Sequence, residues 1–309
     1  MYKYISFIIP TYNKDNDTIK RCLDSIPLRD DVQVLVIDDH SPCYYNEKGN
    51  LKTEKISKLP YFNNPCVEYF FLPKNEGPGK ARNYALIKAE GEWILFCDAD
   101  DYYEKSMLLD LMKTSSETDA DVIFFGYNKV VGSKSEFCGY GKCCDSVLLQ
   151  KIEDKDNFWM ELFPWQRMVR RSFIQENHLN FENLYLSEDR LFCIKQVALS
   201  DKLFVYNRPV YNYVQYEESL SHVKPSLSKA IGAINVAMKV NLLLKENGKL
   251  ETISDCTLPK YLSVLYDYSP VLYWIYTIKN IVMLGWQSAM KDRLSVCYIR
   301  NVHSNLYLQ

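Results

Sequence analysis

The stretch Trp93–Tyr103, WILFCDADDYY, decides the fold class of this chain. A continuous apolar segment runs directly into a cluster of carboxylates. A strand that is apolar on both faces is covered by other elements on both faces, as in the parallel sheets of α/β proteins. In such sheets, ligands bind beyond the carboxyl ends of the strands. The stretch therefore predicts an α/β fold whose functional edge carries these carboxylates.

Further apolar runs have the same character, and helical patterns lie between them. In residues 15–26 apolar side chains recur at the spacing of an amphipathic helix, with Asp17 as the expected N-cap. Because alternating strands and helices indicate parallel crossovers, we expect a Rossmann-like, mostly parallel central sheet covered by helices. The other predicted strands are ISFIIP (5–10), VQVLVID (32–38), VEYFFLP (67–73), DVIFFGY (121–127) and KLFVYNRPVYNYV (202–214), and the other predicted helices span 77–92 and 104–117.

The tripeptide DAD occurs twice, and position separates the two copies. Residues 98–100 follow a strand, whereas residues 119–121 precede one and so lie at the opposite edge, where we expect a structural role. Clustered carboxylates repel one another, and a divalent cation shared with phosphate oxygens relieves this repulsion. We therefore expect Asp98 and Asp100 to bind Mn²⁺ or Mg²⁺. For Asp101 the alternative is an N-cap of the following helix.

The ends of the first two strands carry groups suited to a nucleotide. Pro10, Thr11 and Tyr12 follow the first strand, and Asp39 follows the second. A nucleobase needs a stacking surface and an acceptor for its ring N–H. Tyr12 and Asp39 supply these two groups, so we expect this part of the edge to bind the base.

A glycine-rich helix start follows the third strand. KNEGPGKARNYAL places Gly77 and Gly79 beside Lys80 and Arg82. Backbone N–H groups and cations at a helix start favour phosphate, although the spacing matches neither a P-loop nor a dinucleotide fingerprint. We include Arg82 among the residues expected to contact the donor.

These segments together resemble family 2 glycosyltransferases with the GT-A fold, which build bacterial capsules and other surface polysaccharides. The resemblance implies an inverting enzyme that uses a nucleotide sugar, most often a UDP-sugar, with Mn²⁺ or Mg²⁺. By motif matching, Asp39 contacts uracil, the middle of DADD (Ala99 and Asp100) meets ribose and diphosphate, and Asp100 holds the metal. The resemblance covers roughly residues 1–220 and is carried, in order, by SFIIPTYNKDNDTIKRCLDSI, VLVIDDHSP, KNEGPGKARNYALIKAEGEWILFCDADD and LYLSEDRLF.

The catalytic base is assigned through the same resemblance. LSEDRLFCIKQ matches the family's ED motif, with Asp189 as the base and Glu188 beside it. A sugar hydroxyl must lose its proton as it attacks the anomeric carbon, and a carboxylate within hydrogen-bonding distance can accept that proton. The alternative is a helix start at which Ser187 is the N-cap and both acids lie in the first turn.

Two further segments have open interpretations. Trp165 and Arg167 resemble the stretch that lines the acceptor side in the family, where an aromatic face stacks on a sugar, whereas Trp165 is alternatively a core residue. Residues 132–148 are turn-rich and indicate a surface excursion. His222 is either a surface residue or a polar group near the donor.

The chain divides on these grounds into a nucleotide-sugar-binding and catalytic domain, residues 1–225, and a helical C-terminal extension, residues 226–309. The extension is dense in tyrosine and tryptophan. Internal packing or a homodimer interface accounts for these residues, and so does peripheral contact with a membrane that carries a lipid-linked acceptor. Residues 269–286 are too short and too polar for a spanning helix.

Composition narrows the function classes. The formal net charge of −2 argues against nucleic-acid binding, and the ten cysteines lack CxxC spacing, which indicates reduced thiols. The N-terminus has no export signal, so we expect a cytoplasmic protein, at most at the inner face of the membrane. The alternatives to an enzyme acting on a saccharide or lipid-linked acceptor are a non-catalytic subunit of a polysaccharide complex and a nucleotidyltransferase.

Overall fold

The computed structural model describes residues 3–140, 149–184, 186–215, 225–250 and 257–285. The strands are β1 (Ile5–Thr11), β2 (Val32–Asp38), β3 (Val67–Phe71), β4 (Trp93–Phe96), β5 (Tyr102–Tyr103), β6 (Val122–Val131), β7 (Lys134–Cys138), β8 (Gln150–Lys151), β9 (Arg167–Arg170) and β10 (Leu203–Val214). The α-helices are α1 (Asn16–Asp24), α2 (Thr53–Ile56), α3 (Pro78–Lys88), α4 (Lys105–Ser115), α5 (Arg171–Glu176), α6 (Arg190–Leu199), α7 (Leu227–Glu246), α8 (Thr257–Tyr268) and α9 (Pro270–Leu284). Short 3₁₀ turns occupy Pro42–Tyr44, Asp156–Phe158 and Pro164–Gln166.

One mixed sheet forms the centre of the molecule, in the order β3-β2-β1-β4-β9-β6-β10-β5. Strands β1 to β4 are parallel, and β6 pairs with β10 in parallel, as expected. Strand β9 is not among the predicted strands; it inserts between β4 and β6 and pairs antiparallel with both. Both of its neighbours therefore keep the same direction, and the sheet remains mostly parallel.

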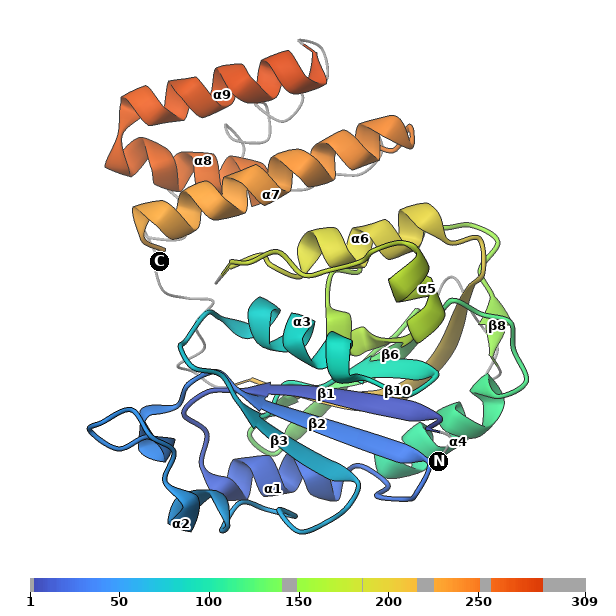
Figure 1. The fold of residues 1–309 in the computed structure, drawn as a ribbon. Helices are drawn as coiled ribbons and strands as arrows, with labels where there is room; N and C mark the ends of the chain where they lie inside the picture. The colour runs from blue at the N-terminus through green and yellow to red at the C-terminus, as the bar shows by residue number, and fades with distance from the viewer. Residues whose placement is uncertain (1–2, 141–148, 185, 216–224, 251–256, 286–309) are drawn as a thin grey trace.

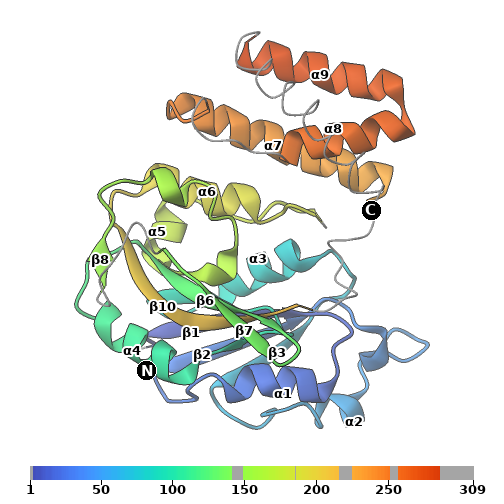
Figure 2. The ribbon, with the colours of Figure 1, turned by 180° about the vertical axis from the view of Figure 1, so that it is seen from behind.

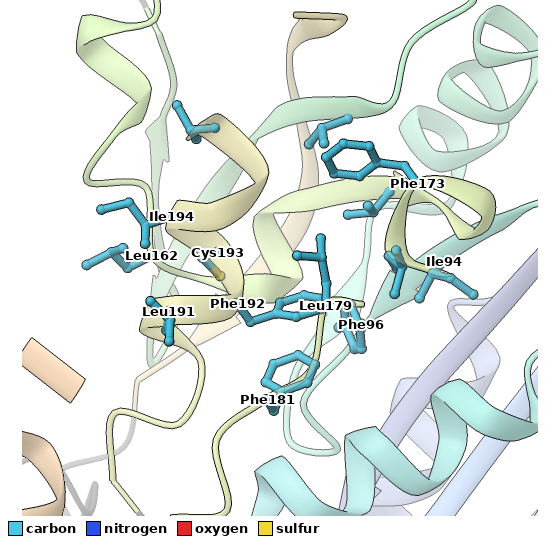
Figure 3. Close-up of a cluster of buried hydrophobic side chains, with 14 of the residues drawn as sticks. Ile94, Phe96, Leu162, Phe173, Leu179, Phe181, Leu191, Phe192, Cys193 and Ile194 are labelled. Carbon is cyan, nitrogen blue, oxygen red and sulfur yellow. The ribbon is translucent and has the colours of Figure 1, made fainter. Parts of the chain in front are cut away.

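Helices cover both faces of the sheet, as the continuous apolar strands predict. All seven residues of β2 are buried. Helices α3, α5 and α6 lie over one face, and α1 and α4 lie over the other (Figures 1 and 2). Under α6, Phe192 packs against Phe96 and Phe181 in a core cluster (Figure 3). The carboxyl ends of β1, β2 and β4 consequently meet at one edge that is held rigidly by two cores.

The helix starts differ in detail from the sequence expectation. Asp15, rather than Asp17, is the N-cap of α1 and accepts a hydrogen bond from the Thr18 backbone N–H at 2.8 Å. Asp17 lies in the first turn, where a negative charge favours the positive end of the helix dipole. The predicted start is therefore off by two residues, because both aspartates suit a helix N-terminus.

The turn-rich segment after β6 is partly ordered as a hairpin. Strand β6 continues to Val131, turns at Gly132 with φ of 58°, and pairs with β7. The side chains of β7 are mostly exposed, so the segment lies at the surface as predicted. The prediction did not include the strand β7. Residues 141–148 of the same segment lie outside the described part of the chain.

Three helices follow β10 and pack as a layer above α6 (Figures 1 and 2). Helix α7 ends at Glu246 and is followed by Gly248 with φ of 68°, the left-handed conformation in which a glycine commonly ends a helix. One side of α7 joins the core under α6, and the other forms a second cluster with α8. A division at residue 226 stays a prediction, because α7 belongs to both clusters.

The C-terminal helices have mixed surfaces. Helix α7 is long and apolar enough to cross a membrane by length and composition, but half of it is buried inside the protein, which is also typical of a core helix. Helix α9 is too short for that test. It carries an exposed apolar face formed by Val271, Trp274, Ile275, Ile278 and Val282.

The apolar side chains buried beneath α6 should contribute more to the free energy of unfolding than exposed apolar side chains do. Ile194 on α6 is fully buried, whereas Ile87 on α3 is 82% exposed. We expect Ile194→Ala to lower the free energy of unfolding by about 2–5 kcal/mol, and Ile87→Ala to change it by less than about 0.5 kcal/mol. Both substitutions alter helix propensity equally, so chemical denaturation isolates the packing effect. Equal losses would contradict the assigned core.

Candidate active site

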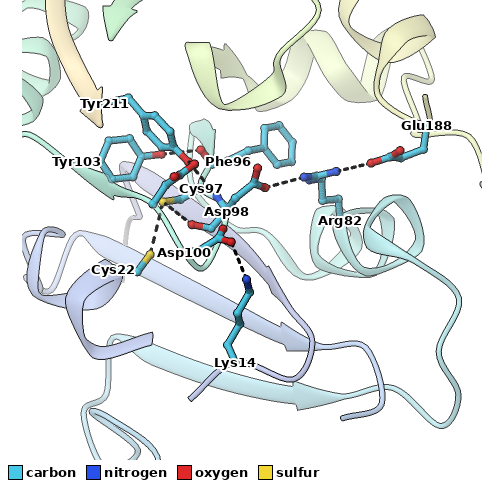
Figure 4. Close-up of polar contacts among 11 residues, drawn as sticks. Lys14, Cys22, Arg82, Phe96, Cys97, Asp98, Asp100, Tyr103, Glu188 and Tyr211 are labelled. Carbon is cyan, nitrogen blue, oxygen red and sulfur yellow. Dashed lines mark hydrogen bonds and ion pairs between the residues drawn. The ribbon is translucent and has the colours of Figure 1, made fainter. Parts of the chain in front are cut away.

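The DADD loop begins where β4 ends, at the edge formed by the parallel strands. The Cys97 N–H still donates to Ile8 O at 3.0 Å, and the chain then turns, with Asp101 N donating to Asp98 O at 2.9 Å. Asp98 and Asp100 keep about a third of their side chains exposed, at 35% and 31%. The Asp98 carboxylate points toward Arg82 and the Asp100 carboxylate toward Lys14 (Figure 4). The second DAD behaves as expected, since it precedes β6 and Asp119 pairs only loosely with Lys202 at 3.5 Å.

Asp101 anchors this loop and does not cap a helix. It is 1% exposed and accepts hydrogen bonds from the Tyr211 hydroxyl at 2.8 Å and the Val214 N–H at 2.7 Å. Burial, and then the charge of Asp98, raise the pKa of Asp101 to about 8. Tyr211 also accepts a hydrogen bond from Asp98 N. The cap interpretation is therefore wrong, because the Asp101 carboxylate is bound by Tyr211 and Val214 of β10 and not by the backbone N–H groups of α4.

Arg82 joins the DADD loop to the loop that carries the ED motif. Its two terminal nitrogens donate to Asp98 Oδ1 at 2.8 Å and to Glu188 Oε1 at 3.0 Å (Figure 4). Burial alone would lower the pKa of Arg82, but the charges of Asp98 and Glu188 outweigh it and raise the pKa further. The guanidinium is 5% exposed and engaged with carboxylates, so its predicted phosphate contact stays a prediction. What it does here is hold two acidic loops together.

The glycines of the α3 start serve close packing. A Cβ atom on Gly79 would lie 2.7 Å from Glu182 O and 2.8 Å from Glu188 Cγ, closer than real Cβ contacts allow. Gly77 has φ of 92°, and its N–H donates to Asp39 Oδ2 at 2.7 Å. The Gly77 amide is therefore already bound to Asp39, and Gly79 lets the ED loop approach α3.

Glu188 and Asp189 lie at the start of α6. Asp189 occupies the N-cap position without a side-chain cap bond, and Ser187 precedes it with φ of 61°, so Ser187 is not the N-cap. Asp189 is half-buried. Burial, and then the nearby charge of Glu188, raise its pKa to about 7. A carboxylate with this pKa is suited to accept a proton near neutral pH.

The first two strand ends form the other side of the edge. Asp39 is 4% exposed and accepts hydrogen bonds from the backbone N–H groups of Glu76 and Gly77. Tyr12 is 43% exposed, which leaves its ring available for stacking. The buried Thr11 hydroxyl has no hydrogen-bond partner among the described residues. Pro10 is half-buried beside them, and Ala99 is buried within the DADD loop.

The described residues contain no group of three or more His, Cys, Asp or Glu side chains placed to hold a metal. Asp98 and Asp100 supply two carboxylates, which fits a Mg²⁺ or Mn²⁺ ion only if donor phosphates and water complete its coordination. Lys14 Nζ lies 2.6 Å from Asp100 Oδ2 and neutralises that carboxylate. A metal bound at Asp100 would displace this lysine.

The candidate acceptor residues are buried. Trp165 is 3% exposed and stacks on Tyr211 at 4.7 Å, so the core interpretation is correct and its ring is not available to a sugar in this structure. Arg167 is fully buried and donates to Cys193 O. His222 lies outside the described residues.

Lys14 and Tyr211 take part in this site but were not predicted. Lys14 comes three residues after β1 in TYNK, a position from which a long side chain reaches the neighbouring strand end. Tyr211 belongs to β10, more than a hundred residues after the loop it supports. Beneath the loop, the thiols of Cys22 and Cys97 touch at 3.4 Å, and both are free and buried.

Comparison with known proteins finds similarity to glycosyltransferases. The profile described as Glycosyl transferase family 2 matches residues 6–137. Poly(ribitol-phosphate) beta-N-acetylglucosaminyltransferase TarS of Staphylococcus aureus strain Mu50 is 26% identical over 93% of this chain and 48% of its own length. A putative glycosyltransferase EpsH of Bacillus subtilis is 24% identical over 80% of this chain and 71% of its own length.

Solved structures show the same architecture. The crystal structure of S. aureus TarS 1–349 in complex with UDP-GlcNAc aligns with a TM-score of 0.68 at 23% identity, over 92% of this chain and 82% of that one. GalNAc-T7 with UDP, GalNAc and Mn²⁺ aligns with a TM-score of 0.52 at 15% identity, over 79% of this chain and 48% of that one. These similarities show the GT-A fold. The chain spans about half the length of TarS, at 48%.

Gly79→Ala should damage the site while leaving the fold in place. The added methyl group must push the ED loop away from Arg82, and a displacement of about 1 Å can lower turnover roughly a hundredfold. The measurement is donor turnover alongside circular dichroism. Ile87→Ala on the same helix, whose side chain is 82% exposed, is the control and should keep full activity. Normal turnover by Gly79→Ala would contradict the close approach.

Proposed function

Since residues 6–137 match the profile described as Glycosyl transferase family 2, we propose that the chain is an inverting glycosyltransferase of that family. It transfers a sugar from a UDP-sugar to a hydroxyl group of a saccharide or lipid-linked acceptor in surface polysaccharide synthesis. The observation that carries the proposal is the Arg82 bridge, in which one guanidinium pairs with Asp98 of the DADD loop and with Glu188 of the ED loop. A donor held by the first loop lies beside the base of the second.

The donor side is assigned from the strand ends. Tyr12 offers an exposed ring for the uracil, and Asp39 offers an acceptor for its ring N–H. Pro10, Thr11 and Ala99 flank the path toward ribose, and the unpartnered Thr11 hydroxyl is available to a polar ligand. UDP-GlcNAc bound to TarS supports a nucleotide-sugar donor.

Asp98 and Asp100 would hold Mn²⁺ or Mg²⁺, which supplies positive charge to the departing diphosphate. The structure of GalNAc-T7 with UDP, GalNAc and Mn²⁺, which has a similar fold, supports the use of a divalent metal. An ion held by Asp100 would displace Lys14 from that carboxylate, and the freed ammonium group could then pair with the donor phosphates. Arg82 keeps Asp98 oriented through this exchange.

Asp189 accepts the proton of the attacking hydroxyl. Its pKa of about 7 keeps a useful fraction ionised at neutral pH and gives it a higher proton affinity than an ordinary aspartate. Glu188 is occupied by Arg82 and orients the loop instead of exchanging protons. One base and one direct displacement invert the anomeric centre.

The acceptor, the assembly and the location are less constrained. The names of the relatives specify poly(ribitol-phosphate) in some cases and cholesterol in another, so family membership does not define the acceptor. The exposed apolar face of α9 suits peripheral membrane contact or a homodimer. We place the enzyme in the cytoplasm, where nucleotide sugars are made, with a lipid-linked acceptor at the inner face of the membrane.

The direct test is UDP release from a panel of UDP-sugars with and without Mn²⁺, because water substitutes slowly for a missing acceptor. We expect metal-dependent release from one donor. If no donor is hydrolysed and calorimetry detects no UDP binding, the proposal fails, and a non-catalytic subunit of a polysaccharide complex becomes the better description.

The two DAD tripeptides provide a matched pair for the metal. Asp100→Ala should abolish the Mn²⁺-dependent part of UDP binding, whereas Asp119→Ala, at the opposite end of the sheet beside Lys202, should leave it intact. Isothermal titration calorimetry with UDP and Mn²⁺ measures both. Equal effects of the two substitutions would contradict a metal site at the strand end.

The pKa of Asp189 predicts a pH profile. The base must be ionised, so kcat/KM should rise with pH through about 7 and level off above it. Asp189→Asn should retain UDP affinity and lose transfer by a factor of about 10² or more. A variant that transfers at the wild-type rate would place the base elsewhere.

A further inference from the structure

A groove of about 790 Å³ runs along the far side of the ED loop. One wall is the loop itself, at residues 178–184, and the other walls are formed by α6, α7 and α9. A loop and three helices that are distant in sequence thus enclose a surface next to the loop that carries the proposed catalytic base. None of the functions assigned above uses it.

The lining of this groove is cationic. Lys195 of α6, Lys239 of α7 and Lys279 of α9 all contribute to it, with Glu182 as the one carboxylate. Glu182 is already paired with Lys239 at 2.9 Å. Lys195 and Lys279 have no carboxylate partner within the described ranges. The groove therefore carries an excess of two positive charges in a chain whose formal net charge is −2.

The remaining groups favour a phosphate-bearing chain over a neutral sugar. The amides of Asn180, Asn183 and Asn235 line the groove and can bind hydroxyl groups. Among the described lining residues the only rings are Phe181, which is 3% exposed, and the imidazole of His178, so no tyrosine or tryptophan face is presented for sugar stacking. Lysines pair well with phosphate as flexible point charges.

The groove is mechanically connected to the ED loop. Glu182 N donates to Glu188 O at 3.0 Å, and the Asn83 side chain exchanges two hydrogen bonds with the backbone of Phe181. Leu184 packs on the bare backbone of Gly232 in α7. The loop that forms this wall also carries Asp189, so it would guide a ligand bound in the groove toward the base.

We propose that this groove binds an anionic segment of the acceptor, namely a phosphodiester-linked polyol chain, and directs a hydroxyl group of it toward Asp189. The identity of the bound chain as acceptor rests on the proposed function, whereas the binding of a polyol phosphate does not. A neutral polysaccharide would make no use of Lys195 and Lys279.

The experiment is a binding titration without donor, using a synthetic glycerol phosphate hexamer and a neutral dextran hexamer as probes. The wild-type chain should bind the phosphate oligomer and not the dextran, with affinity that falls as salt rises. The double variant Lys195→Gln/Lys279→Gln should bind the oligomer about tenfold or more weakly, since charge-assisted contacts are lost. Lys48→Gln/Lys55→Gln, which replaces two exposed lysines outside the groove, is the charge-matched control and should bind normally.

The outcomes separate the groove from the catalytic proposal. UDP release by the double variant in the absence of acceptor should equal that of the wild type. Equal oligomer affinity in the double variant, or no oligomer binding by a wild-type chain that binds UDP, would overturn the groove and leave the proposed function standing. Binding to anionic phosphatidylglycerol vesicles alone, lost in the double variant, would overturn it in favour of a membrane surface. Oligomer binding without any UDP binding would keep the groove and remove the proposed function.

Discussion

The contact between the buried Arg82 guanidinium and two carboxylates is the interaction on which the site depends. Asp98 and Glu188 belong to loops that are 90 residues apart in the chain, and no backbone pairing joins them. An arginine can bind both because its planar group presents donors in a fixed fork, which a lysine cannot reproduce. A buried arginine without its partners would cost several kcal/mol. The three groups therefore keep each other in place.

The surrounding contacts extend this arrangement in both directions. On the nucleotide side, Asp39 holds the start of α3 through two backbone amides, and α3 in turn carries Arg82. On the opposite side, Asp101 ties the DADD loop to β10 through Tyr211. Each of these hydrogen bonds and ion pairs joins only two neighbouring segments. Together they connect the segments that carry Asp39, Arg82, the DADD motif and the ED motif to one another and to β10. The open edge of the sheet is thus a rigid surface before any ligand binds, which lowers the entropic cost of orienting one.

Local patterns predicted much of this structure. Continuous apolar runs located β1 to β4, β6 and β10, and the order of strand and carboxylates distinguished the two DAD tripeptides. Strand β9 was not predicted, because RMVR is short and follows a proline-containing turn, so its pairing depends on partners elsewhere in the chain. The burial of Trp165 and the anchoring of Asp101 have the same cause. Both depend on Tyr211, which only the tertiary fold brings near.

The position of β9 also bears on how the chain folds during synthesis. Strand β6 is flanked in the sheet by β9 and β10, and both come later in the chain than residue 137, where the family match ends. As the chain emerges from the ribosome, β6 can pair with β7 but has neither of its central neighbours. Sheet closure must wait for contacts of long sequence separation, which slow folding. The matched segment is therefore not an autonomous folding unit, and a nascent chain exposes an apolar strand edge until residues 167–170 and 203–214 have been made.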